Sequence, residues 1–486
     1  MNPLDPLFEP QGIIVAGASA HPGKFGFVTL HNILSCGYEG RVLPVSLEGG
    51  EVLGRRVATS VDDLPDGAAD LVFVCTPPSA NPELLAACAR RGVKVAFVAT
   101  AGYAEAGADG ERAQAELVAV AAAHGMVLAG PNGQGVVSTP VSLCAQIVAP
   151  YPPAGRIGIV SQSGNLLSSF LDLSIDSGVG VSRAVSAGNA AATTVADYLD
   201  YLADDAATAV SLAYVESVGD GRRFYDVARR TTDRQPLVVL QGGSTAGGRR
   251  AAASHTGSLA SDARVFAGVC RQDGVARAET VEEAFDAAAV FATTPLPAGP
   301  NVVVVTTVGG WGVLTADAVT RSDLTLLELP ADLLAALDDQ LPARWSRNNP
   351  IDLAGSETRD TVTEVLDLVA RHDAVHAVVF LGIGIQSNEA RMMREGPYFP
   401  EHGLGRVVEF HERQDARYAE AAAAISAATG KPILVASELA VTDRDNAGPR
   451  AVREAGGYCV PSATRAVRAL EHLWHRARRR RRMDAE

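Results

Sequence analysis

The chain has 486 residues, of which 47% are hydrophobic and 20% are charged, and its formal net charge is −14. This composition is typical of a soluble globular protein, and the length suits about three domains of roughly 100–200 residues. The acidic balance argues against nucleic-acid binding, and neither a membrane span nor a signal-peptide pattern occurs. The six cysteines form no Cys-x-x-Cys pair. We therefore expect reduced core thiols in a cytoplasmic protein, without a metal site.

Apolar strands alternate with helix-like segments over the first 148 residues. The predicted strands are 12–17, 41–45, 70–75, 93–100 and 126–129, and the predicted helices between them include 82–91 and 110–124. Continuous apolar strands joined by helices are typical of a parallel sheet that is covered on both faces.

Two Pro-rich segments, 149–155 and 294–300, divide the rest of the chain. The second unit has predicted strands at 156–160, 180–185, 208–215 and 236–240, and the third has strands at 301–307, 375–381 and 432–437. The polar stretch 386–414 is expected to leave the third sheet. The predicted domains are therefore 1–148, 149–297 and 298–475, followed by a basic tail, 476–486, which we interpret as the solvated end of the last helix.

The tetrapeptide Ser254-His255-Thr256-Gly257 follows the fourth strand of the second unit and precedes a predicted helix at 258–272. A histidine at such a turn, between hydroxyl and glycine neighbours, can reach a phosphate held by backbone N–H groups. His255 is therefore a candidate nucleophile for phosphoryl transfer. The alternative is a loop histidine that is fixed by local hydrogen bonds.

Three more features end strands of the same predicted sheet and therefore share its carboxyl edge, where open parallel sheets bind ligands. They are the turn with Ser161, Ser163, Gly164 and Asn165, the turn with Gly188 and Asn189, and Glu216. A carboxylate bonded to one ring nitrogen of His255 would leave the other nitrogen free to attack phosphorus. The alternatives are simple N-capping by a serine and a solvent-facing glutamate.

A glycine-rich turn follows the first predicted strand and opens a helix. Its candidate ligand-binding residues are Gly17, Ser19, Gly23, Lys24 and Gly26. Such a turn suits a diphosphate but is a weak signal for any particular nucleotide. No acidic residue stands out as a ribose anchor, and Arg41 with Pro44 in the second strand favours a phosphorylated nucleotide over NAD. Lys24 is one of only three lysines; the alternative is a solvated surface side chain.

The ordered set of motifs resembles the nucleoside-diphosphate-forming acyl-CoA synthetases, in particular the α-subunit part of ADP-forming acetate–CoA ligase, a relative of succinyl-CoA synthetase. The resemblance covers almost the whole chain. The motifs that carry it are Gly17-Ala18-Ser19, Pro22-Gly23-Lys24, Thr76-Pro77-Pro78, Thr100-Ala101-Gly102-Tyr103, Gly130-Pro131-Asn132, Ser161-Gln162-Ser163-Gly164-Asn165, Ser186-Ala187-Gly188-Asn189, Glu216, Ser254-His255-Thr256-Gly257, Asn349-Pro350-Ile351-Asp352-Leu353, and Val460-Pro461-Ser462 with Arg465 and Arg468.

The resemblance implies an α/β fold with an N-terminal Rossmann-like CoA-binding domain followed by two flavodoxin-like domains of the succinyl-CoA-ligase type. His255 then resembles the histidine that is transiently phosphorylated, and Glu216 the carboxylate that positions it. The implied phosphate-binding residues are Ser161, Ser163, Gly164, Asn165, Gly188, Asn189, Ser254, Thr256 and Gly257. The implied CoA-binding surface comprises Gly17, Ser19, Gly23, Lys24, Gly26, Pro44, Thr76, Pro77, Pro78, Ala101 and Gly102, with Asn132 near the thioester carbonyl.

The implied reaction converts acyl-CoA, phosphate and ADP reversibly to a carboxylic acid, CoA and ATP. No ATP-grasp segment is found, so the resemblance implies a separate ATP-grasp β-type partner that binds ATP or ADP with Mg, in a homo- or hetero-oligomer without nucleic-acid or membrane partners. The chain departs from the family at Gln241, often lysine, at Gly133, usually cysteine, and at Trp311 in a glycine-rich turn. The alternatives are a non-catalytic CoA- or acyl-CoA-binding regulator or scaffold and, more remotely, an NAD(P)-dependent dehydrogenase.

Overall fold

A computed structural model describes residues 2–148, 150–248, 250, 263–353 and 360–485. The chain divides into two compact units, one formed by Met1–Ile175 and Gly180–Ala284 and the other by Asp176–Val179 and Phe285–Glu486. No helix in the described part of the chain is both long and apolar enough to cross a membrane. The six cysteines, all described, are free thiols, and four of them are buried.

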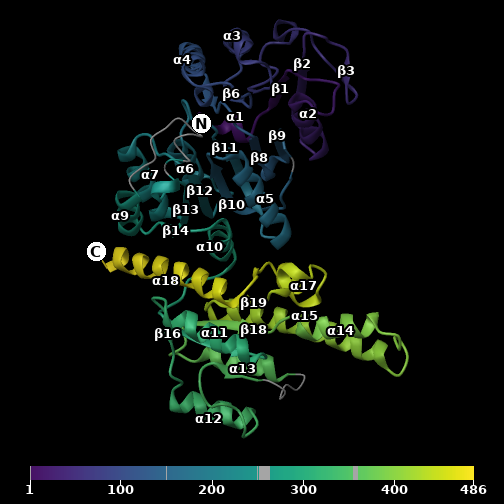
Figure 1. Cartoon of the computed structure of the whole chain (residues 1–486), viewed down its shortest axis with the longest axis vertical. Coiled ribbons are helices and arrows are strands. Elements are labelled where there is room, and N and C mark those ends of the chain that lie inside the picture. Colours follow the sequence, from purple (N-terminus) through teal and green to yellow (C-terminus); the bar gives the residue numbers. More distant parts are fainter. Residues whose placement is uncertain (1, 149, 249, 251–262, 354–359, 486) are drawn as a thin grey trace. The chain divides into compact units, whose positions relative to one another are not determined.

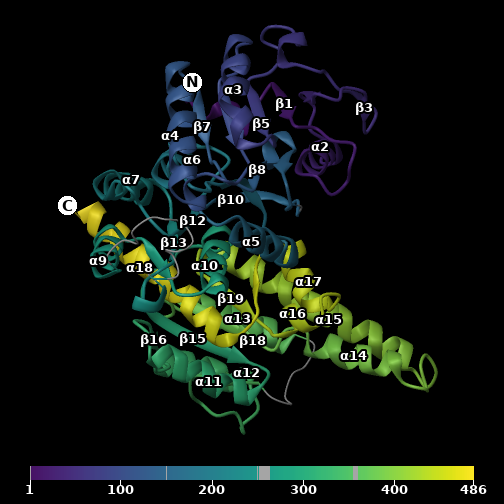
Figure 2. The ribbon, with the colours of Figure 1, turned by 45° about the horizontal axis from the view of Figure 1, so that its top comes forward.

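The first sheet of the first unit is fully parallel. Its strands lie in the order β2 (Arg41–Val45), β1 (Gly12–Ala16), β5 (Leu71–Val74), β6 (Val95–Val98) and β7 (Val127–Ala129). Helix α2 (Phe25–Ser35) covers one face, and α3 (Asn81–Arg90) and α4 (Ala108–Ala123) cover the other, as Figures 1 and 2 both show. All five predicted strands are present, and each begins or ends within two residues of its prediction.

Alternation along β1 explains why both faces of this sheet are covered. Ile13 and Val15 belong to the same buried cluster as Leu30 of α2. Ile14, between them, belongs to a second cluster with Leu85 of α3. Successive side chains of a strand point to opposite faces, so a continuous apolar strand needs helices on both sides.

The second sheet of the first unit has seven strands. They lie in the order β14 (Ala276–Ala278), β13 (Leu237–Gln241), β12 (Val210–Val215), β10 (Ala154–Ser161), β11 (Val181–Ser186), β8 (Gly135–Ser138) and β9 (Leu143–Gln146). Strand β8 pairs antiparallel with β11 and with β9, and the other pairings within this sheet are parallel. Strands β8 and β9 precede the predicted boundary at residue 148 but belong to the second sheet, so the chain changes sheets between β7 and β8.

The helices that follow these strands, and the short elements of this unit, complete the first unit. The helices are α5 (Gly164–Ser177), α6 (Val195–Asp204), α7 (Gly221–Arg234) and α9 (Ala263–Asp273); the short elements are α1 (Asp5–Phe8), β3 (Glu51–Val52) and β4 (Arg55–Arg56). Helix α10 (Val281–Thr293) begins in the first unit, but its residues from Phe285 on belong to the second unit. Helix α9 corresponds to the predicted helix at 258–272, of which residues 258–262 lie outside the described residues.

A buried arginine ties the start of the chain to the second sheet. Arg183 of β11 is 2% exposed, and its Nε lies 3.3 Å from Oδ2 of Asp205. Its Nη1 donates to the carbonyl oxygen of Phe8 at 3.2 Å, and its Nη2 pairs with Glu9. Since an isolated buried charge is costly, this set of acceptors is what makes the burial of Arg183 tolerable.

The second unit has one parallel sheet. Its strands lie in the order β16 (Thr325–Leu326), β15 (Asn301–Thr306), β18 (Ala377–Leu381), β19 (Ile433–Ala436) and β20 (Cys459–Val460), and β17 (Ile351–Asp352) also pairs with β15. Its helices are α11 (Gly309–Thr320), α12 (Ala331–Gln340), α13 (Thr361–Arg371), α14 (Ile385–Glu395), α15 (Leu404–Thr429), α16 (Leu439–Thr442), α17 (Ala447–Glu454) and α18 (Ala463–Ala485).

Two expectations about this unit are answered by its helices. The polar stretch 386–414 leaves the sheet, as predicted, because it forms α14 and most of the first half of α15. The basic segment 476–486 forms the end of the last helix, as interpreted, since α18 runs to Ala485. Arg480 and Arg482 are exposed as expected, whereas Arg476 is 5% exposed, because α18 packs this face against its own unit.

Candidate active site

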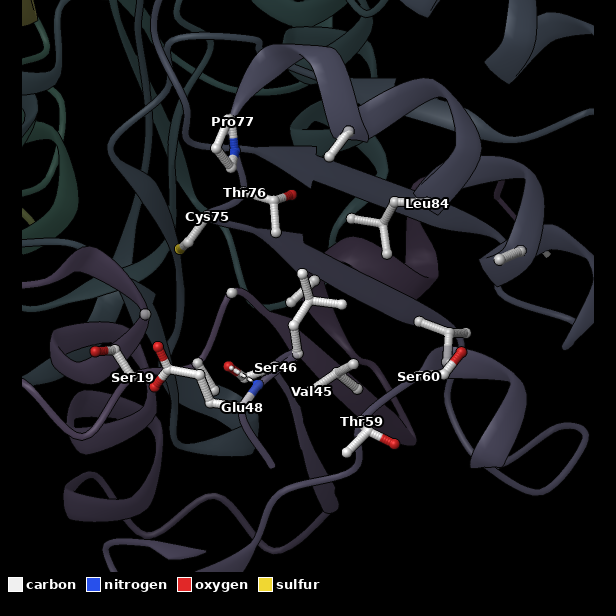
Figure 3. A pocket seen from close by; sticks show the side chains of 18 of the residues that line it. Ser19, Val45, Ser46, Glu48, Thr59, Ser60, Cys75, Thr76, Pro77 and Leu84 are labelled. Atoms are coloured by element: carbon white, nitrogen blue, oxygen red, sulfur yellow. Dashed lines mark hydrogen bonds between the residues drawn. The ribbon is translucent and has the colours of Figure 1, made fainter. Parts of the chain in front are cut away.

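A cavity of about 790 Å³ opens at the carboxyl ends of β1, β2 and β5. This volume lies within the range of about 300–1,000 Å³ that is usual for small-molecule sites. Figure 3 shows its wall: Ser46 and Glu48 follow β2, Thr59 and Ser60 come from the loop after β4, and Thr76 follows β5. The cavity therefore occupies the position where open parallel sheets bind ligands.

Close backbone packing forms the floor of this cavity. Gly17 has a φ of +84°, and its N–H donates to the carbonyl oxygen of Val45 at 3.0 Å. A Cβ at Gly26, in the first turn of α2, would lie only 2.0 Å from the Gly17 carbonyl oxygen. Lys24 precedes α2 without a side-chain capping bond. The Phe27 N–H donates to the Lys24 carbonyl oxygen at 3.0 Å, whereas the N–H groups of Phe25 and Gly26 have no acceptor among the described residues, so these two can donate to a ligand beside a lysine.

Seven of the predicted CoA-binding residues line the cavity: Gly17, Ser19, Gly23, Lys24, Gly26, Thr76 and Pro77. Pro44, Pro78, Ala101, Gly102 and Asn132 are not among its lining residues. The prediction that Arg41 favours a phosphorylated nucleotide over NAD is wrong, because Arg41 lies at the amino end of β2 and donates to the Gly67 carbonyl oxygen at 3.1 Å. The direction of a strand decides which of its ends faces the site.

Sequence reasoning missed the acidic side chains of the cavity. Glu48, Asp62 and Glu83 all line it, together with the basic residues Lys24 and Arg90. Arg90 lies 3.7 Å from Asp62, and both side chains are more than half exposed. An acidic residue shortly after the second strand was the available signal for Glu48, because this is where ribose-binding carboxylates lie in dinucleotide sites. Burial raises the pKa of the cavity's Cys75 thiol to about 12, so it stays protonated.

A second candidate site lies at the carboxyl edge of the second sheet. Between the end of β10 at Ser161 and the start of α5 at Gly164, only Gln162 and Ser163 intervene. The Ser161 hydroxyl donates to the Ser163 carbonyl oxygen at 2.6 Å, and Ser163 Oγ accepts the Leu166 N–H at 3.4 Å. The serine capping that we considered as an alternative is therefore present. It coexists with a helix start whose first N–H groups have no acceptor within the helix.

The turn after β11 lies against the segment that connects the two sheets. Gly188 has a φ of +54°, and a Cβ there would lie 2.2 Å from the Pro131 carbonyl oxygen. Asn189 donates its N–H to the same oxygen at 2.9 Å, and the Asn132 Nδ2 donates to Asn189 Oδ1 at 3.3 Å. The predicted thioester residue and the predicted phosphate turn are thus in direct contact.

Glu216 follows β12 and is 8% exposed. Its Oε1 accepts a hydrogen bond from the Tyr214 hydroxyl at 3.1 Å, whereas its buried Oε2 has no partner among the described residues. Burial, together with the Glu216 charge, raises the pKa of Tyr214. Gln162 Oε1 accepts the N–H groups of Glu216 and Ser217 at 2.6 and 3.0 Å, which joins this strand end to the Ser161–Gly164 turn. Ser254, His255, Thr256 and Gly257 lie outside the described residues.

The three residues that depart from the family pattern, Gly133, Gln241 and Trp311, have different surroundings in the structure. A cysteine side chain does not fit at Gly133, because a Cβ would lie 2.7 Å from Phe97 Cζ and 2.8 Å from the Ser186 carbonyl oxygen. Gln241 ends β13, is 9% exposed, and its Oε1 has no partner in the described part of the chain. Trp311 lies in the first turn of α11, half-buried.

One group of side chains among the described residues has the spacing of metal ligands: Asp323, Glu471 and His475. Their atoms are engaged with one another and with arginine. His475 Nε2 lies 3.0 Å from Asp323 Oδ2, and Arg468 lies 2.5 Å from Glu471. The cluster is an ion-pair network on the second unit.

Three family models match the chain in succession. They are a CoA binding domain over residues 11–139, a succinyl-CoA ligase like flavodoxin domain over 154–291, and a ligase-CoA domain over 302–385. The α subunit of an ADP-forming acetate–CoA ligase from Pyrococcus furiosus is 37% identical over 382 residues, which cover 78% of this chain and 82% of that protein. The chain belongs to the nucleoside-diphosphate-forming acyl-CoA synthetase family.

Two more relatives define how far the similarity extends. An ADP-forming acetate–CoA ligase of Archaeoglobus fulgidus is 36% identical over 77% of this chain, which spans only 54% of that longer protein. The solved structure of a Ca. Korarchaeum cryptofilum acetyl-coenzyme A synthetase, in complex with phosphate and ADP, is 29% identical with a TM-score of 0.83. The matched region covers 100% of this chain and 99% of the chain in that solved structure. The expected fold, a CoA-binding domain followed by domains of the succinyl-CoA-ligase type, is confirmed.

Proposed function

We propose that the chain is the α-type part of an ADP-forming acyl-CoA synthetase that works through a phosphohistidine at His255. In one direction its substrates are an acyl-CoA and phosphate. In the reverse direction they are the corresponding carboxylic acid and CoA. The nucleotide step takes place on an ATP-grasp β-type partner that binds ADP or ATP with Mg. The names of the Pyrococcus furiosus relatives, which are α subunits, support the need for a partner.

The proposed reaction has three balanced steps. A phosphate oxygen attacks the thioester carbonyl carbon, the C–S bond breaks, and CoA leaves with an acyl phosphate behind. A ring nitrogen of His255 attacks phosphorus, the bond to the acyl oxygen breaks, and the carboxylate leaves. An oxygen of ADP then attacks phosphorus, the P–N bond breaks, and ATP leaves with the histidine restored. Synthesis of the thioester runs through the same steps in reverse.

The observation that carries this proposal is the carboxylate of Glu216. It is nearly buried, it ends the strand next to the Ser161–Gly164 turn, and its Oε2 has no partner among the described residues. A buried carboxylate oxygen without a donor is costly. An N–H of the His255 ring would supply that donor and would leave the second ring nitrogen as the nucleophile. The positive end of α5 would stabilise the charge of the transferred phosphoryl group.

The cavity at the glycine-rich turn supports CoA as the thiol substrate. Its floor leaves no room for side chains at Gly26, and the start of α2 with Lys24 suits a diphosphate. We propose that CoA binds in the part of the chain that is built on the first sheet and that the phosphoryl group is held in the part that is built on the second sheet, which includes β8 and β9.

The test is phosphate labelling of the purified chain. We expect incubation with ³²P-phosphate and acetyl-CoA, or another thioester from a panel of acyl-CoAs, to give a base-stable, acid-labile label that maps to His255. The variant His255→Ala should lose the label. The variant His124→Ala, at an exposed position after α4, should keep it. A second arm supplies ATP and an ATP-grasp chain in place of the thioester.

The alternative function is a CoA- or acyl-CoA-binding regulator. Gln241, which replaces a lysine frequent in the family, lies at the carboxyl end of β13 and motivates this alternative. A chain that binds CoA but acquires no label in either arm of the experiment would reject the ligase proposal in favour of the regulator.

A further inference from the structure

Glu105 links the two sheets of the first unit. It lies in a single turn of 3-10 helix, Ala104–Ala106, which follows the predicted CoA-binding residues Ala101 and Gly102. Its Oε1 accepts the N–H groups of Gly102 at 2.5 Å and Tyr103 at 3.1 Å. Its Oε2 accepts from Nδ2 of Asn189 at 2.6 Å. One carboxylate therefore binds both the turn after β6 and the turn after β11.

The hydrogen bonds continue beyond Asn189. Its Nδ2 also donates to Gln114 Oε1 at 3.0 Å, and its Oδ1 accepts from Nδ2 of Asn132 at 3.3 Å. Asn132 has a positive φ of 59°, and its backbone N–H donates to the Thr100 carbonyl oxygen at 3.1 Å. Its backbone is held by this bond, so the remaining freedom of Asn132 is the orientation of its side-chain amide.

The direction of this chain of hydrogen bonds follows from the chemistry of its first member. An ionised carboxylate only accepts hydrogen bonds, whereas an amide has a donating and an accepting end. The Asn189 amide must therefore turn its NH₂ to Glu105 and its oxygen to Asn132. Asn132 must then turn its own NH₂ to Asn189. Exchanging donor for acceptor at position 105 would reverse both amides.

Glu105 remains ionised in this setting. Burial favours the neutral acid, but the hydrogen bonds from Asn189 and from the backbone N–H groups outweigh it, so the pKa of Glu105 is lowered. At neutral pH the carboxylate is thus a fixed acceptor.

We propose that Glu105 is a positioning residue for acyl transfer: it sets the hydrogen-bond polarity of the Asn189–Asn132 amide pair and so decides which end of the Asn132 amide faces the thioester. This inference rests on the proposed function, which assigns Asn132 to the thioester carbonyl. The same carboxylate holds the turn with Gly102. Glu105 therefore couples the CoA-binding domain to the turn with Gly188 and Asn189, which is predicted to hold phosphate.

The variant Glu105→Gln separates the two tasks of this carboxylate. The glutamine oxygen can still accept from Gly102 and Tyr103, so we expect the Kd for CoA, measured by calorimetry, to stay within about threefold of the wild type. Its NH₂ faces the NH₂ of Asn189 and forces the amide pair to reverse. We expect labelling of His255 by ³²P-phosphate and acyl-CoA to slow by about 10- to 100-fold, because the reversed Asn132 amide offers the wrong end to the thioester and one hydrogen bond is lost there. Glu111→Gln, exposed on α4, should label at the wild-type rate.

A charge-swapped double variant provides the decisive comparison. In Glu105→Gln with Asn189→Asp, the glutamine NH₂ donates to an aspartate that accepts on both sides, so Asn132 regains its original orientation. We expect this double variant to label faster than either single variant. Asn189→Asp alone puts two carboxylates in contact, and its labelling rate should rise as the pH falls, because one shared proton relieves the repulsion.

The outcomes separate the inference from the function on which it rests. A wild-type chain without any label rejects the proposed function. A wild-type chain that labels, with Glu105→Gln equal to it or with no rescue in the double variant, rejects the role of Glu105 alone. Thermal unfolding of the four proteins gives a readout without activity: the two substitutions should destabilise the chain less together than the sum of their single effects.

Discussion

The substitution Gly26→Ala is the most stringent test of whether the cavity at the carboxyl edge of the first sheet binds CoA. A Cβ there would lie 2.0 Å from the carbonyl oxygen of Gly17 and 2.7 Å from its carbon, whereas ordinary contact begins near 3.4 Å. Both opposing atoms belong to the backbone and cannot rotate away. Gly26→Ala therefore forces the start of α2 to move from the glycine-rich turn by more than an ångström.

The magnitude follows from what the start of α2 offers to a phosphate. Hydrogen bonds to a charged group contribute about 1.5–3 kcal/mol each, and the helix end contributes at most about 2 kcal/mol. Losing one such bond and part of the helix-end effect should weaken CoA binding by about 2–4 kcal/mol, which is a rise in Kd of roughly 30- to 1,000-fold. Overpacking should also lower the free energy of unfolding by about 1–3 kcal/mol.

The assay is calorimetric titration of CoA, with thermal unfolding recorded on the same samples. The matched control is Gly268→Ala, within helix α9, because a Cβ at Gly268 meets no described atom within 4 Å. That variant should bind CoA normally and gain about 0.5–1 kcal/mol of stability from the better helix former. An unchanged Kd in a folded Gly26→Ala protein would refute the assignment of the start of α2 to the CoA diphosphate.

Three further outcomes are expected. Glu216→Gln keeps an oxygen for the Tyr214 hydroxyl but removes the charge, so labelling of His255 should slow by about tenfold or more with the Kd for CoA unchanged; equal labelling would remove Glu216 from the site. In a urea titration, Arg183→Leu should lower the free energy of unfolding by about 3–5 kcal/mol, since it leaves the buried Asp205 carboxylate without its cationic partner. Arg222→Leu, which breaks an exposed pair with Asp226, should lower it by less than about 1 kcal/mol in the same assay. Burial, with the nearby charges of Lys431 and Arg481, lowers the pKa of His376, whose Nδ1 accepts the N–H of Asn301 at 3.1 Å; NMR titration should give a value below the ordinary value of about 6.5. Because the unfolded chain binds the proton more tightly, His376 contributes stability above its ordinary pKa of about 6.5, and this contribution is lost as the pH falls through the lowered pKa of the folded state. A measured pKa at or above 6.5 would contradict the reasoning.

The local pattern of the sequence was sufficient for the repeating strands and helices. Strands such as Arg41–Val45 and Val210–Val215 are short apolar runs bounded by turn residues, and each is recognised without knowledge of its neighbours. The turns at Gly17 and Gly188 were also predicted from the local sequence, and the structure shows that both glycines have a positive φ there. The carboxyl-edge rule then brought Ser161 and Glu216 to one side of one sheet, and β10 and β12 are indeed neighbours.

The tertiary structure decided which distant residues meet. The hairpin of β8 and β9 lies inside the predicted first domain, 1–148, but it extends the second sheet because β8 pairs with β11. Glu48 faces the cavity and Arg41 does not, because β2 runs toward the site. Glu105 reaches Asn189 across 84 positions of sequence. A single sequence records the chemistry of each group, but pairing over such separations depends on how two sheets pack, and no local pattern encodes that packing.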